Sequence, residues 1–298
     1  MSMGDKVEVR DGDIPGDYHC ACAWCSKAIG ELRPLDGSYY SRLERRAYYS
    51  PTEKGKGGHI AKTPLHIARW AIQAYSKKGD WVLDPTIGAG TTAVESLTQG
   101  RSVAGMELEF GQILSDNIKK ALSTIPKGSA EAKVAQGDAR NIGDFLKKVD
   151  QKFKLVVNNP PYSGDKSVGT LIKGGPPQIL YAYDKKLPNL AFLNEGPVYI
   201  ETMTDIYKAC VSALQPGGHF VVGVKDMMRK REPFLLHQIY CRILEDLGME
   251  YVGAAFLKHY PGTLFLNTYF TARGVHPPYY QTIVVFKKPG GRAAKKLS

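Results

Sequence analysis

Two short motifs combine residue types that could bind and activate a small ligand. The first follows the apolar run 81–83 and precedes a helix-like run at 92–97. A strand, a glycine turn and a helix in this order let the backbone approach a bound nucleotide. Glycine is needed where a Cβ would block that approach or where φ is positive. Glycine turns also close ordinary loops between strands and helices, so this motif is not decisive alone. Its residues are Asp84, Pro85, Gly88, Gly90, Thr91 and Thr92.

The second motif is Asn159-Pro160-Pro161-Tyr162, which directly follows the hydrophobic run 154–158. Two prolines end sheet pairing and hold the backbone rigid. The Asn159 amide and the Pro160 carbonyl are then expected to be fixed at the carboxyl edge of the sheet, where ligands bind in open α/β folds. A plain turn is the alternative, but the position after a strand and downstream of a glycine turn favours a site.

Acidic residues end or follow two further apolar runs. Glu107 ends the run 101–107. It lies about twenty residues past the glycines, where an acidic side chain commonly accepts hydrogen bonds from ribose hydroxyls. Asp138 follows the run 132–136. A solvated surface acid is the alternative for Glu107. Both acids are expected at the carboxyl ends of their strands.

Three cysteines cluster near the N-terminus. The spacing Cys22-x-x-Cys25 is typical of metal ligands, and Cys20 or His19 could add a third. No second Cys-x-x-Cys follows, so a four-ligand zinc site would need a distant residue such as His59. Reduced structural thiols are the simpler interpretation, and we assign no metal ligand from the sequence.

The hydrophobic pattern predicts the elements that position these motifs. Thr63 can cap a first helix, and Pro64 suits its first turn. The segment 163–199, rich in Gly, Pro, Lys, Tyr and Asn, is expected to be a long loop or lid. Alternation of strands and helices predicts an α/β domain over 60–298, preceded by a small irregular N-terminal extension at 1–59. Strands are expected near 81–83, 101–107, 132–136, 154–158, 219–224, 251–256 and 281–286, and helices near 64–76, 92–97, 108–125, 200–214 and 233–247.

The amino-acid composition limits the class of binding partner and the cellular location that we expect. The 298 residues carry 40 Lys and Arg against 29 Asp and Glu, a formal net charge of +11. Such an excess suits a polyanion, and nucleic acid is the usual one. No apolar run reaches the length of a membrane span, and no signal sequence is evident, so we expect a cytoplasmic protein. Five cysteines do not form the pattern of a secreted disulfide framework.

Together, the motifs resemble the amino DNA methyltransferases, which methylate adenine N6 or cytosine N4. The resemblance covers about 60–289. It rests on Asp84-Pro85 with the glycines, on Asn159-Pro160-Pro161-Tyr162, and on Lys62-Thr63-Pro64. The last third agrees through Leu214-Gln215-Pro216-Gly217-Gly218-His219 and the closing run 280–289. The family implies a Rossmann-like seven-stranded sheet, with helices on both faces, that binds S-adenosylmethionine.

The resemblance also implies roles for single residues. Gly88 and Gly90 would lie against the cofactor, Asp84 would brace the loop, and Glu107 would hold the ribose. Asp138 would sit beside the adenine ring. Thr63 and Pro64 would line the methionine end of the cofactor. The other residues that the resemblance places at the cofactor are Pro85, Thr91, Thr92 and Asn159.

The catalytic motif suggests a mechanism. Asn159 Oδ1 and the Pro160 carbonyl could accept both N–H groups of an exocyclic amine, pulling its nitrogen toward tetrahedral geometry. Methyl transfer is then an in-line displacement in which placement does most of the work. Tyr162 would stack on a base flipped out of the duplex. Phosphate contacts by Lys and Arg would make binding fall with salt.

Several alternatives stay open. Asn at the first motif position favours adenine over cytosine, because cytosine enzymes of the family more often carry Ser there. The order of the motifs looks permuted relative to subgroups with Asp-Pro in the glycine loop. No large target-recognition domain is evident, so only 1–59 and 163–199 could recognise a sequence. An RNA base methyltransferase, a protein-glutamine methyltransferase and a nucleic-acid-binding protein on an inactive fold are the rivals, and a restriction-modification role and the oligomeric state are open.

Overall fold

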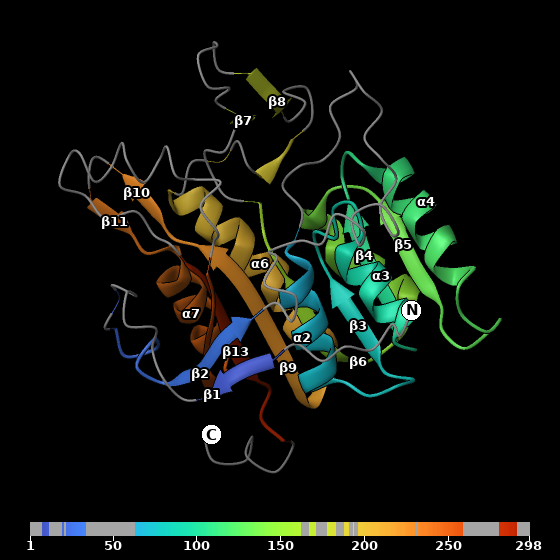
Figure 1. The fold of residues 1–298 in the computed structure, drawn as a ribbon, viewed down its shortest axis with the longest axis horizontal. Helices are drawn as coiled ribbons and strands as arrows, with labels where there is room; N and C mark the ends of the chain where they lie inside the picture. The colour runs from blue at the N-terminus through green and yellow to red at the C-terminus, as the bar shows by residue number, and fades with distance from the viewer. Residues whose placement is uncertain are drawn as a thin grey trace.

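The described residues are built around a large mixed sheet with helices on both faces (Figure 1). The computed structural model describes residues 8–11, 20, 22–33, 63–161, 167–170, 178–182, 188–190, 193, 196–229, 232–258 and 280–290. His19, His59, Lys62 and Tyr162 therefore lie outside the described residues. Among the described helices, none is both long and apolar enough to cross a membrane.

The central sheet has nine strands in the order β1-β2-β12-β13-β9-β6-β3-β4-β5. Strand β13 is antiparallel to both of its neighbours, while β9, β6, β3, β4 and β5 pair in parallel. The strands are β1 (Glu8–Asp11), β2 (Ala28–Arg33), β3 (Trp81–Asp84), β4 (Ser102–Glu107), β5 (Ala132–Gln136), β6 (Phe153–Asn158), β9 (Leu214–Lys225), β12 (Glu250–Lys258) and β13 (Tyr280–Lys287). The seven strands expected from the sequence are all present, and the Rossmann-like prediction is confirmed.

The N-terminal extension adds the two remaining strands. Strand β2 pairs in parallel with β12, and β1 pairs antiparallel with β2. The described part of the N-terminal extension is therefore more regular than the sequence indicated. The pattern could not reveal this, because the pairing partner of Ala28 is Ala254, far along the chain.

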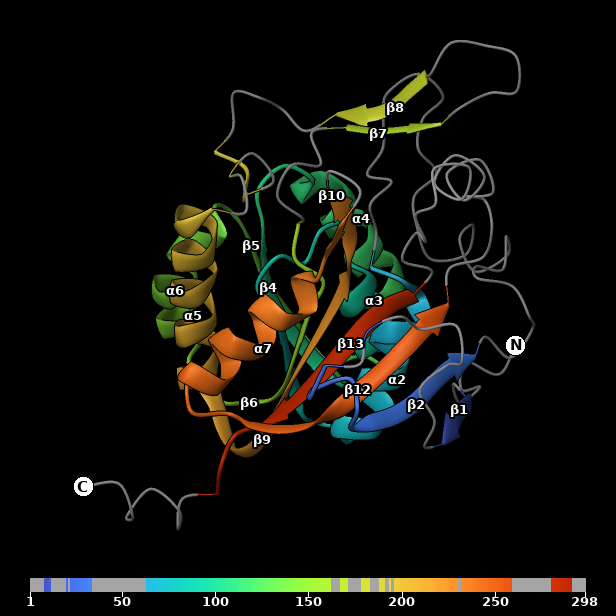
Figure 2. The ribbon, with the colours of Figure 1, turned by 90° about the vertical axis from the view of Figure 1, so that its left-hand side faces the viewer.

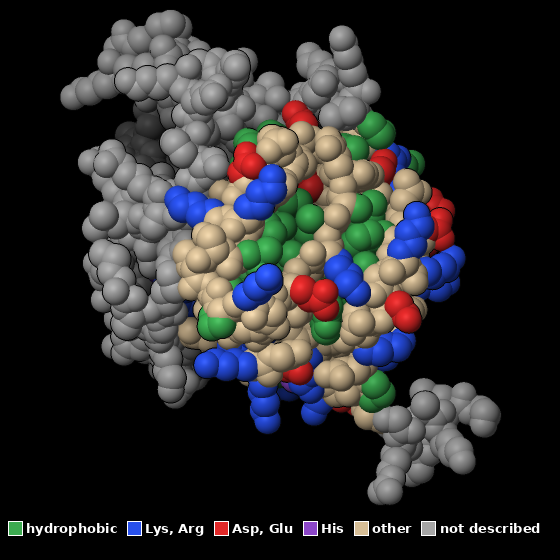
Figure 3. Space-filling model, turned by 90° about the vertical axis from the view of Figure 1, so that its right-hand side faces the viewer, with side chains coloured by type: hydrophobic (Ala, Val, Ile, Leu, Met, Phe, Trp, Pro, Cys, Tyr) green, Lys and Arg blue, Asp and Glu red, His purple; other side chains and the backbone are tan. Residues whose placement is uncertain are grey.

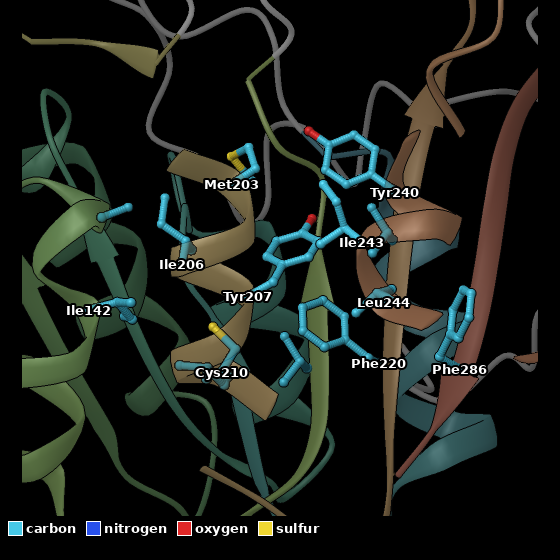
Figure 4. Close-up of a cluster of buried hydrophobic side chains, with 14 of the residues drawn as sticks. Ile142, Met203, Ile206, Tyr207, Cys210, Phe220, Tyr240, Ile243, Leu244 and Phe286 are labelled. Carbon is cyan, nitrogen blue, oxygen red and sulfur yellow. The ribbon is translucent and has the colours of Figure 1, made fainter. Parts of the chain in front are cut away.

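Alternating side chains along the strands build a core on each face of the sheet. Leu155 and Val157 of β6 pack with helix α2 (Leu65–Tyr75), whereas Val156 between them packs on the opposite side with helices α6 (Pro197–Ala213) and α7 (Leu236–Asp246). Figure 4 shows this second core, in which side chains of α6 and α7 meet around Phe220 of β9. The remaining helices are α3 (Thr91–Thr98), α4 (Gly111–Leu122), η1 (Ala139–Asn141) and α5 (Ile142–Val149).

Helices α2, α3 and α4 lie on one face of the sheet, and α5, α6 and α7 on the other (Figure 2). Helices thus cover both faces of the parallel strands, which is the arrangement of doubly wound α/β folds. Ligands of such folds bind beyond the carboxyl ends of the strands, and Asp84, Glu107 and Asn159 lie at or directly after these ends.

Two local predictions were wrong. Helix α2 begins at Leu65 with Pro64 at the N-cap and no side-chain cap, so the Thr63 hydroxyl does not cap it. The segment 163–199 contains paired strands β7 (Ser167–Thr170) and β8 (Gln178–Ala182), and helix α6 begins within it. A further short hairpin joins β10 (Met227–Arg229) to β11 (Glu232–Phe234).

Candidate active site

The glycine turn joins the end of β3 to the start of α3. Gly88 has φ +57° and Gly90, the N-cap of α3, has φ +94°, a region that other residues rarely adopt. A Cβ on Gly90 would lie 2.8 Å from Leu114 Cδ1. The Ile87 amide donates to the Met106 carbonyl at 3.0 Å, which ties the turn to β4. The turn is therefore fixed. Because Gly88 and Gly90 have no side chain, the backbone at these two positions is not covered by one.

Asp84 is buried beneath this turn. Its carboxylate accepts a 2.7 Å hydrogen bond from Thr92 Oγ1 and a 3.2 Å bond from the Thr86 amide. Burial raises the pKa of Asp84 to about 6, and these hydrogen bonds limit the rise. Pro85 and Thr91 are buried beside it. Asp84 thus braces the turn from below, as the resemblance implies.

Asn158 connects the turn to the strand that carries the second motif. Its Nδ2 donates to Asp84 Oδ1 at 3.3 Å and to Thr86 Oγ1 at 2.8 Å. Its Oδ1 accepts from the Tyr207 hydroxyl of α6 at 2.8 Å. Asn158 is completely buried, and both polar atoms of its side chain are hydrogen-bonded within the protein. The ends of β3 and β6 are therefore held in a fixed relationship.

The prolyl corner at 159–161 begins directly after Asn158. Asn159 is half-buried, and its Oδ1 accepts a short hydrogen bond from Gln281 Nε2 of β13. The Pro161 carbonyl accepts a 3.0 Å bond from the Tyr199 hydroxyl. Among the described residues none donates to the Pro160 carbonyl. The corner is thus held on both sides, while one of its carbonyl groups keeps its accepting capacity.

Gly223 of β9 leaves room for the Asn159 side chain. A Cβ on Gly223 would lie 3.3 Å from Asn159 Oδ1, 3.2 Å from Gln281 Nε2 and 3.4 Å from Ile67 Cδ1. Ile67 belongs to the first turn of α2, directly after Thr63 and Pro64. The structure therefore brings the start of α2 close to Asn159, which the sequence could suggest only by resemblance.

Glu107 ends β4 and is bound by backbone amides. Its Oε1 accepts from the Glu109 amide at 2.8 Å and from the Phe110 amide at 3.0 Å, and the Gly88 amide also donates to the carboxylate. Burial raises the pKa of Glu107, and these amides oppose the rise. Glu107 thus lies beside the glycine turn, 8% exposed.

Asp138 follows β5 at the same edge of the sheet. The Gly137 amide before it donates to the Glu107 carbonyl at 2.8 Å. The Asp138 carboxylate accepts from the Arg140 amide and forms an ion pair with the Arg140 guanidinium. That guanidinium also donates to the Pro188 carbonyl at 2.8 Å. Asp138 therefore has a cationic partner that its position in the sequence did not suggest.

Four residues that support the site were missed by the sequence interpretation. They are Asn158, Tyr207, Gln281 and Asn117, whose Nδ2 donates to the Ala89 carbonyl of the turn at 2.7 Å. A doubled Asn at 158–159 at the end of an apolar strand was the available signal for Asn158, because neighbouring residues of a strand face opposite sides. The other three come from distant parts of the chain and have no local signal.

The described site residues fit a nucleoside-type ligand. Asp84, Gly88, Glu107, Asp138 and Asn159 lie at the carboxyl ends of the adjacent strands β6, β3, β4 and β5. A turn without Cβ atoms admits close approach of a ligand to the backbone. Buried carboxylates can accept hydrogen bonds from hydroxyl groups, and the prolyl corner offers acceptors for an amine.

Comparison with known proteins agrees with these motifs. The sequence model of a family described as DNA methylase matches residues 18–114, about a third of the chain, which includes the glycine turn and Glu107. The Type II methyltransferase M.BglI of Bacillus subtilis is 31% identical over 119 residues, or 40% of this chain and 34% of that protein. The Type II methyltransferase M2.DpnII of Streptococcus pneumoniae is 39% identical over 74 residues, or 25% of this chain and 28% of that protein. The matched segments thus span about a third of these relatives.

Solved structures give weaker similarities. TrmN from Thermus thermophilus is 16% identical, with a TM-score of 0.46. The superposition covers 77% of this chain and 50% of TrmN. The magnesium protoporphyrin IX methyltransferase ChlM from Synechocystis PCC 6803, solved with bound SAM, is 11% identical with a TM-score of 0.43 and covers 85% of this chain and 94% of its own. Similarity at this level supports no functional conclusion. The family match and the Type II relatives instead show a partial similarity: about a third of the chain is similar to DNA methylases, in the region that carries the glycine turn.

Proposed function

We propose that this protein is a site-specific DNA methyltransferase that transfers a methyl group from S-adenosylmethionine to the exocyclic amine of a flipped base. The observation that supports it most is the buried bond between Asn158 and Asp84, which joins the glycine turn to the prolyl corner. A methyl donor and an amine acceptor react only when held in line at contact distance. A protein that fixes these two motifs to each other meets that requirement.

The proposed cofactor site uses the turn and the adjacent strand ends. Gly88 and Gly90 would lie against the cofactor, and Glu107, anchored through its Oε1, would offer its carboxylate to the ribose hydroxyls. Asp138 would flank the adenine ring. Thr63 and Pro64 would line the methionine end, with Pro85, Thr91 and Thr92 supporting the turn. The cofactor supplies an electrophilic methyl group on its sulfonium.

The proposed base site is the prolyl corner. Asn159 Oδ1 would accept one N–H of the target amine while keeping its bond from Gln281, because an amide oxygen has two lone pairs. The Pro160 carbonyl would accept the other. These two bonds aim the nitrogen lone pair at the methyl group, and no strong base is needed because the proton leaves after nitrogen becomes cationic. Pro161 stiffens the corner, and Tyr162, outside the described residues, would stack on the base.

Two finer parts of the proposal are the identity of the methylated base and the type of nucleic acid that carries it. Asn159 at the first motif position favours adenine N6, and cytosine N4 is the alternative. The Type II relatives favour DNA in a restriction-modification setting, and RNA is the alternative polymer. Residues 1–59 would form a recognition or metal-binding extension of a methyltransferase domain at 60–298. A cytoplasmic location would give access to DNA.

The net charge of +11 is an excess over the whole chain, and in this overall sense it supports a nucleic-acid substrate. On the face shown in Figure 3, Lys and Arg side chains are spread among Asp and Glu, around hydrophobic side chains at the centre. No continuous basic surface covers that face of the described residues. DNA would therefore bind elsewhere, and the carboxyl edge of the sheet is where its target base must arrive.

The competing hypothesis is a nucleic-acid-binding protein on an inactive fold. The hydrogen bonds that hold Asn159 and Pro161 disfavour it, because a pure binding protein gains nothing from fixed acceptors at the strand edge. A protein-glutamine methyltransferase is disfavoured by the net charge and by the Type II relatives.

One experiment tests the proposal. The purified protein is incubated with methyl-labelled S-adenosylmethionine and, in parallel, with duplex DNA, RNA or a protein mixture. The products are digested and separated. Label in N6-methyladenine from DNA is expected, label in N4-methylcytosine would change the base, and label in RNA or protein would change the substrate class. Cofactor binding without transfer to any of these would favour the inactive fold. Asn159→Ala serves as the negative control.

A further inference from the structure

Three cysteines of the N-terminal extension and one distant histidine converge on a single point. The sulfur atoms of Cys20, Cys22 and Cys25 lie 3.6, 3.4 and 3.3 Å from His237 Nε2. All four candidate ligand atoms lie within 4.8 Å of one another. His237 is in the first turn of α7, more than 200 residues away in the sequence. The fold therefore supplies the fourth ligand that the cysteine spacing alone lacked.

The geometry matches a tetrahedral metal centre. With zinc–sulfur bonds of about 2.3 Å and a zinc–nitrogen bond of about 2.0 Å, a tetrahedral ion separates sulfur from nitrogen by roughly 3.5 Å. The three sulfur–nitrogen distances lie within about 0.2 Å of that value. Three thiolates and one imidazole form a common closed ligand set for structural zinc.

The histidine is oriented for metal binding by a second residue. Asp226, which follows β9, lies 2.7 Å from His237 Nδ1 through its Oδ2 and also accepts from the His237 backbone amide. A carboxylate on Nδ1 fixes the proton there and leaves the Nε2 lone pair facing the sulfurs. Both side chains are buried, His237 completely. Such a carboxylate–histidine pair is the usual support of a zinc-bound imidazole.

The cysteines are held in the manner of a metal-binding turn. The Cys25 amide donates to Cys22 Sγ at 3.5 Å, and the Ser26 amide donates to the Cys22 carbonyl at 3.0 Å. Gln238 Nε2 lies 3.9 Å from Cys20 Sγ. Amide donors of this kind stabilise thiolates. Apolar side chains of β12 and β13 surround Cys20 and Cys25 and exclude solvent.

From these contacts we infer that Cys20, Cys22, Cys25 and His237 bind one structural zinc ion, with Asp226 as the positioning residue for His237. A disulfide explains the arrangement less well, because it would use two sulfurs and leave the third sulfur and the imidazole without a role. The set is closed, with four protein ligands and no open position, so the ion is structural rather than catalytic.

The ion would join three parts of the fold. The cysteines precede β2, Asp226 follows β9, and His237 begins α7. Around it, Trp24 Nε1 donates to Glu245 of α7 at 2.9 Å, and the Ala254 amide of β12 donates to the Lys27 carbonyl at 2.9 Å. The zinc therefore fastens the N-terminal extension to the sheet on the side of α7.

Metal content tests the inference directly on the full chain. The protein is purified without chelator from medium containing zinc and analysed by native and elemental mass spectrometry. One zinc ion per chain is expected. Chelation under reducing conditions followed by Co²⁺ should give the thiolate charge-transfer band and the intense d–d bands of tetrahedral cobalt. Iron in place of zinc, or a reduced protein that takes up neither Zn²⁺ nor Co²⁺, would overturn the assignment.

Variants test the ligand set. Cys22→Ala should lose the zinc, whereas Cys210→Ala, a buried cysteine of α6, should keep it. His237→Cys should retain one zinc with the cobalt spectrum of four thiolates, which a merely structural histidine would not produce. Asp226→Asn should lower zinc affinity about 10- to 100-fold. Wild-type zinc affinity in Cys22→Ala, or equal loss in Cys22→Ala and Cys210→Ala, would contradict this set of ligands.

Discussion

The Asn158 amide and the Asp84 carboxylate share a buried hydrogen bond of 3.3 Å across 74 residues of sequence. The same Asn158 side chain accepts from Tyr207 of α6. Three elements, β3, β6 and α6, are thereby locked at the edge of the sheet where both motifs end. A disturbance of one motif is expected to reach the other through this side chain.

Tyr207→Phe tests this coupling. The change removes the hydroxyl that donates to Asn158 and keeps the ring that packs on Phe220. We expect unfolding free energy to fall by about 1 kcal/mol and S-adenosylmethionine to bind more weakly. Denaturant titration and calorimetry measure the two effects. Tyr240→Phe removes a hydroxyl paired with Tyr199 and should change stability alone. Equal cofactor affinity in both variants would argue against the coupling.

Asn159→Ala should abolish methyl transfer and leave cofactor binding nearly intact, because the proposed role of Asn159 is to accept the amine. Transfer of labelled methyl groups and calorimetry measure the two properties. Gln281→Leu, which removes the donor to Asn159 Oδ1, should lower kcat by a smaller factor with little change in cofactor affinity. If Asn159→Ala lost cofactor affinity, the residue would belong to the cofactor site instead.

Glu107→Gln should weaken S-adenosylmethionine binding about 10- to 100-fold, the range for losing hydrogen bonds to a charged group. Glutamine preserves the oxygen that accepts from the Glu109 and Phe110 amides, so the loop is expected to stay in place. The methylated base should not change. Glu131→Gln, at an exposed position, is the control. An unaltered dissociation constant in Glu107→Gln would remove Glu107 from the ribose site.

Asp84 should make stability depend on pH. Its pKa rises from 3.8 to about 6 on folding because the carboxyl is buried. Between these values the folded protein holds more protons than the unfolded chain, so this contribution to stability is largest at low pH and is lost as pH rises through about 6. The unfolding free energy of wild type relative to Asp84→Asn should fall by about 1 kcal/mol between about pH 5 and about pH 8. Parallel curves for the two proteins would disprove this.

Local patterns predicted the parts of the site that depend on local backbone. Glu107 stands at a strand end, and Asn159 begins a prolyl corner, because alternation, apolar runs and proline act over a few residues. The seven strands followed from the same signals, and their arrangement followed from the family resemblance. Gly88 and Gly90 adopt the positive φ values that the turn was expected to require.

Side-chain contacts across the sheet could not be predicted in this way. Gln281 meets Asn159 across 122 residues, and His237 meets Cys22 across 215. From the sequence, a four-ligand site would have needed a distant residue such as His59, and no local pattern distinguishes one histidine from another. The chosen partner depends on how α7 packs over the sheet, which only the assembled fold determines.

The pairing of Ala28 in β2 with Ala254 in β12 sets an order of events during synthesis. The ribosome delivers β2 first, and its partner strand β12 emerges only after the elements from α2 to α7. Until α7 emerges the three thiols lack the His237 imidazole, and until β12 emerges strands β1 and β2 have no neighbour in the main sheet. Strands β1 and β2 are therefore among the last described elements to reach their final position, and a nascent chain released before α7 would expose the three thiols and these two strands.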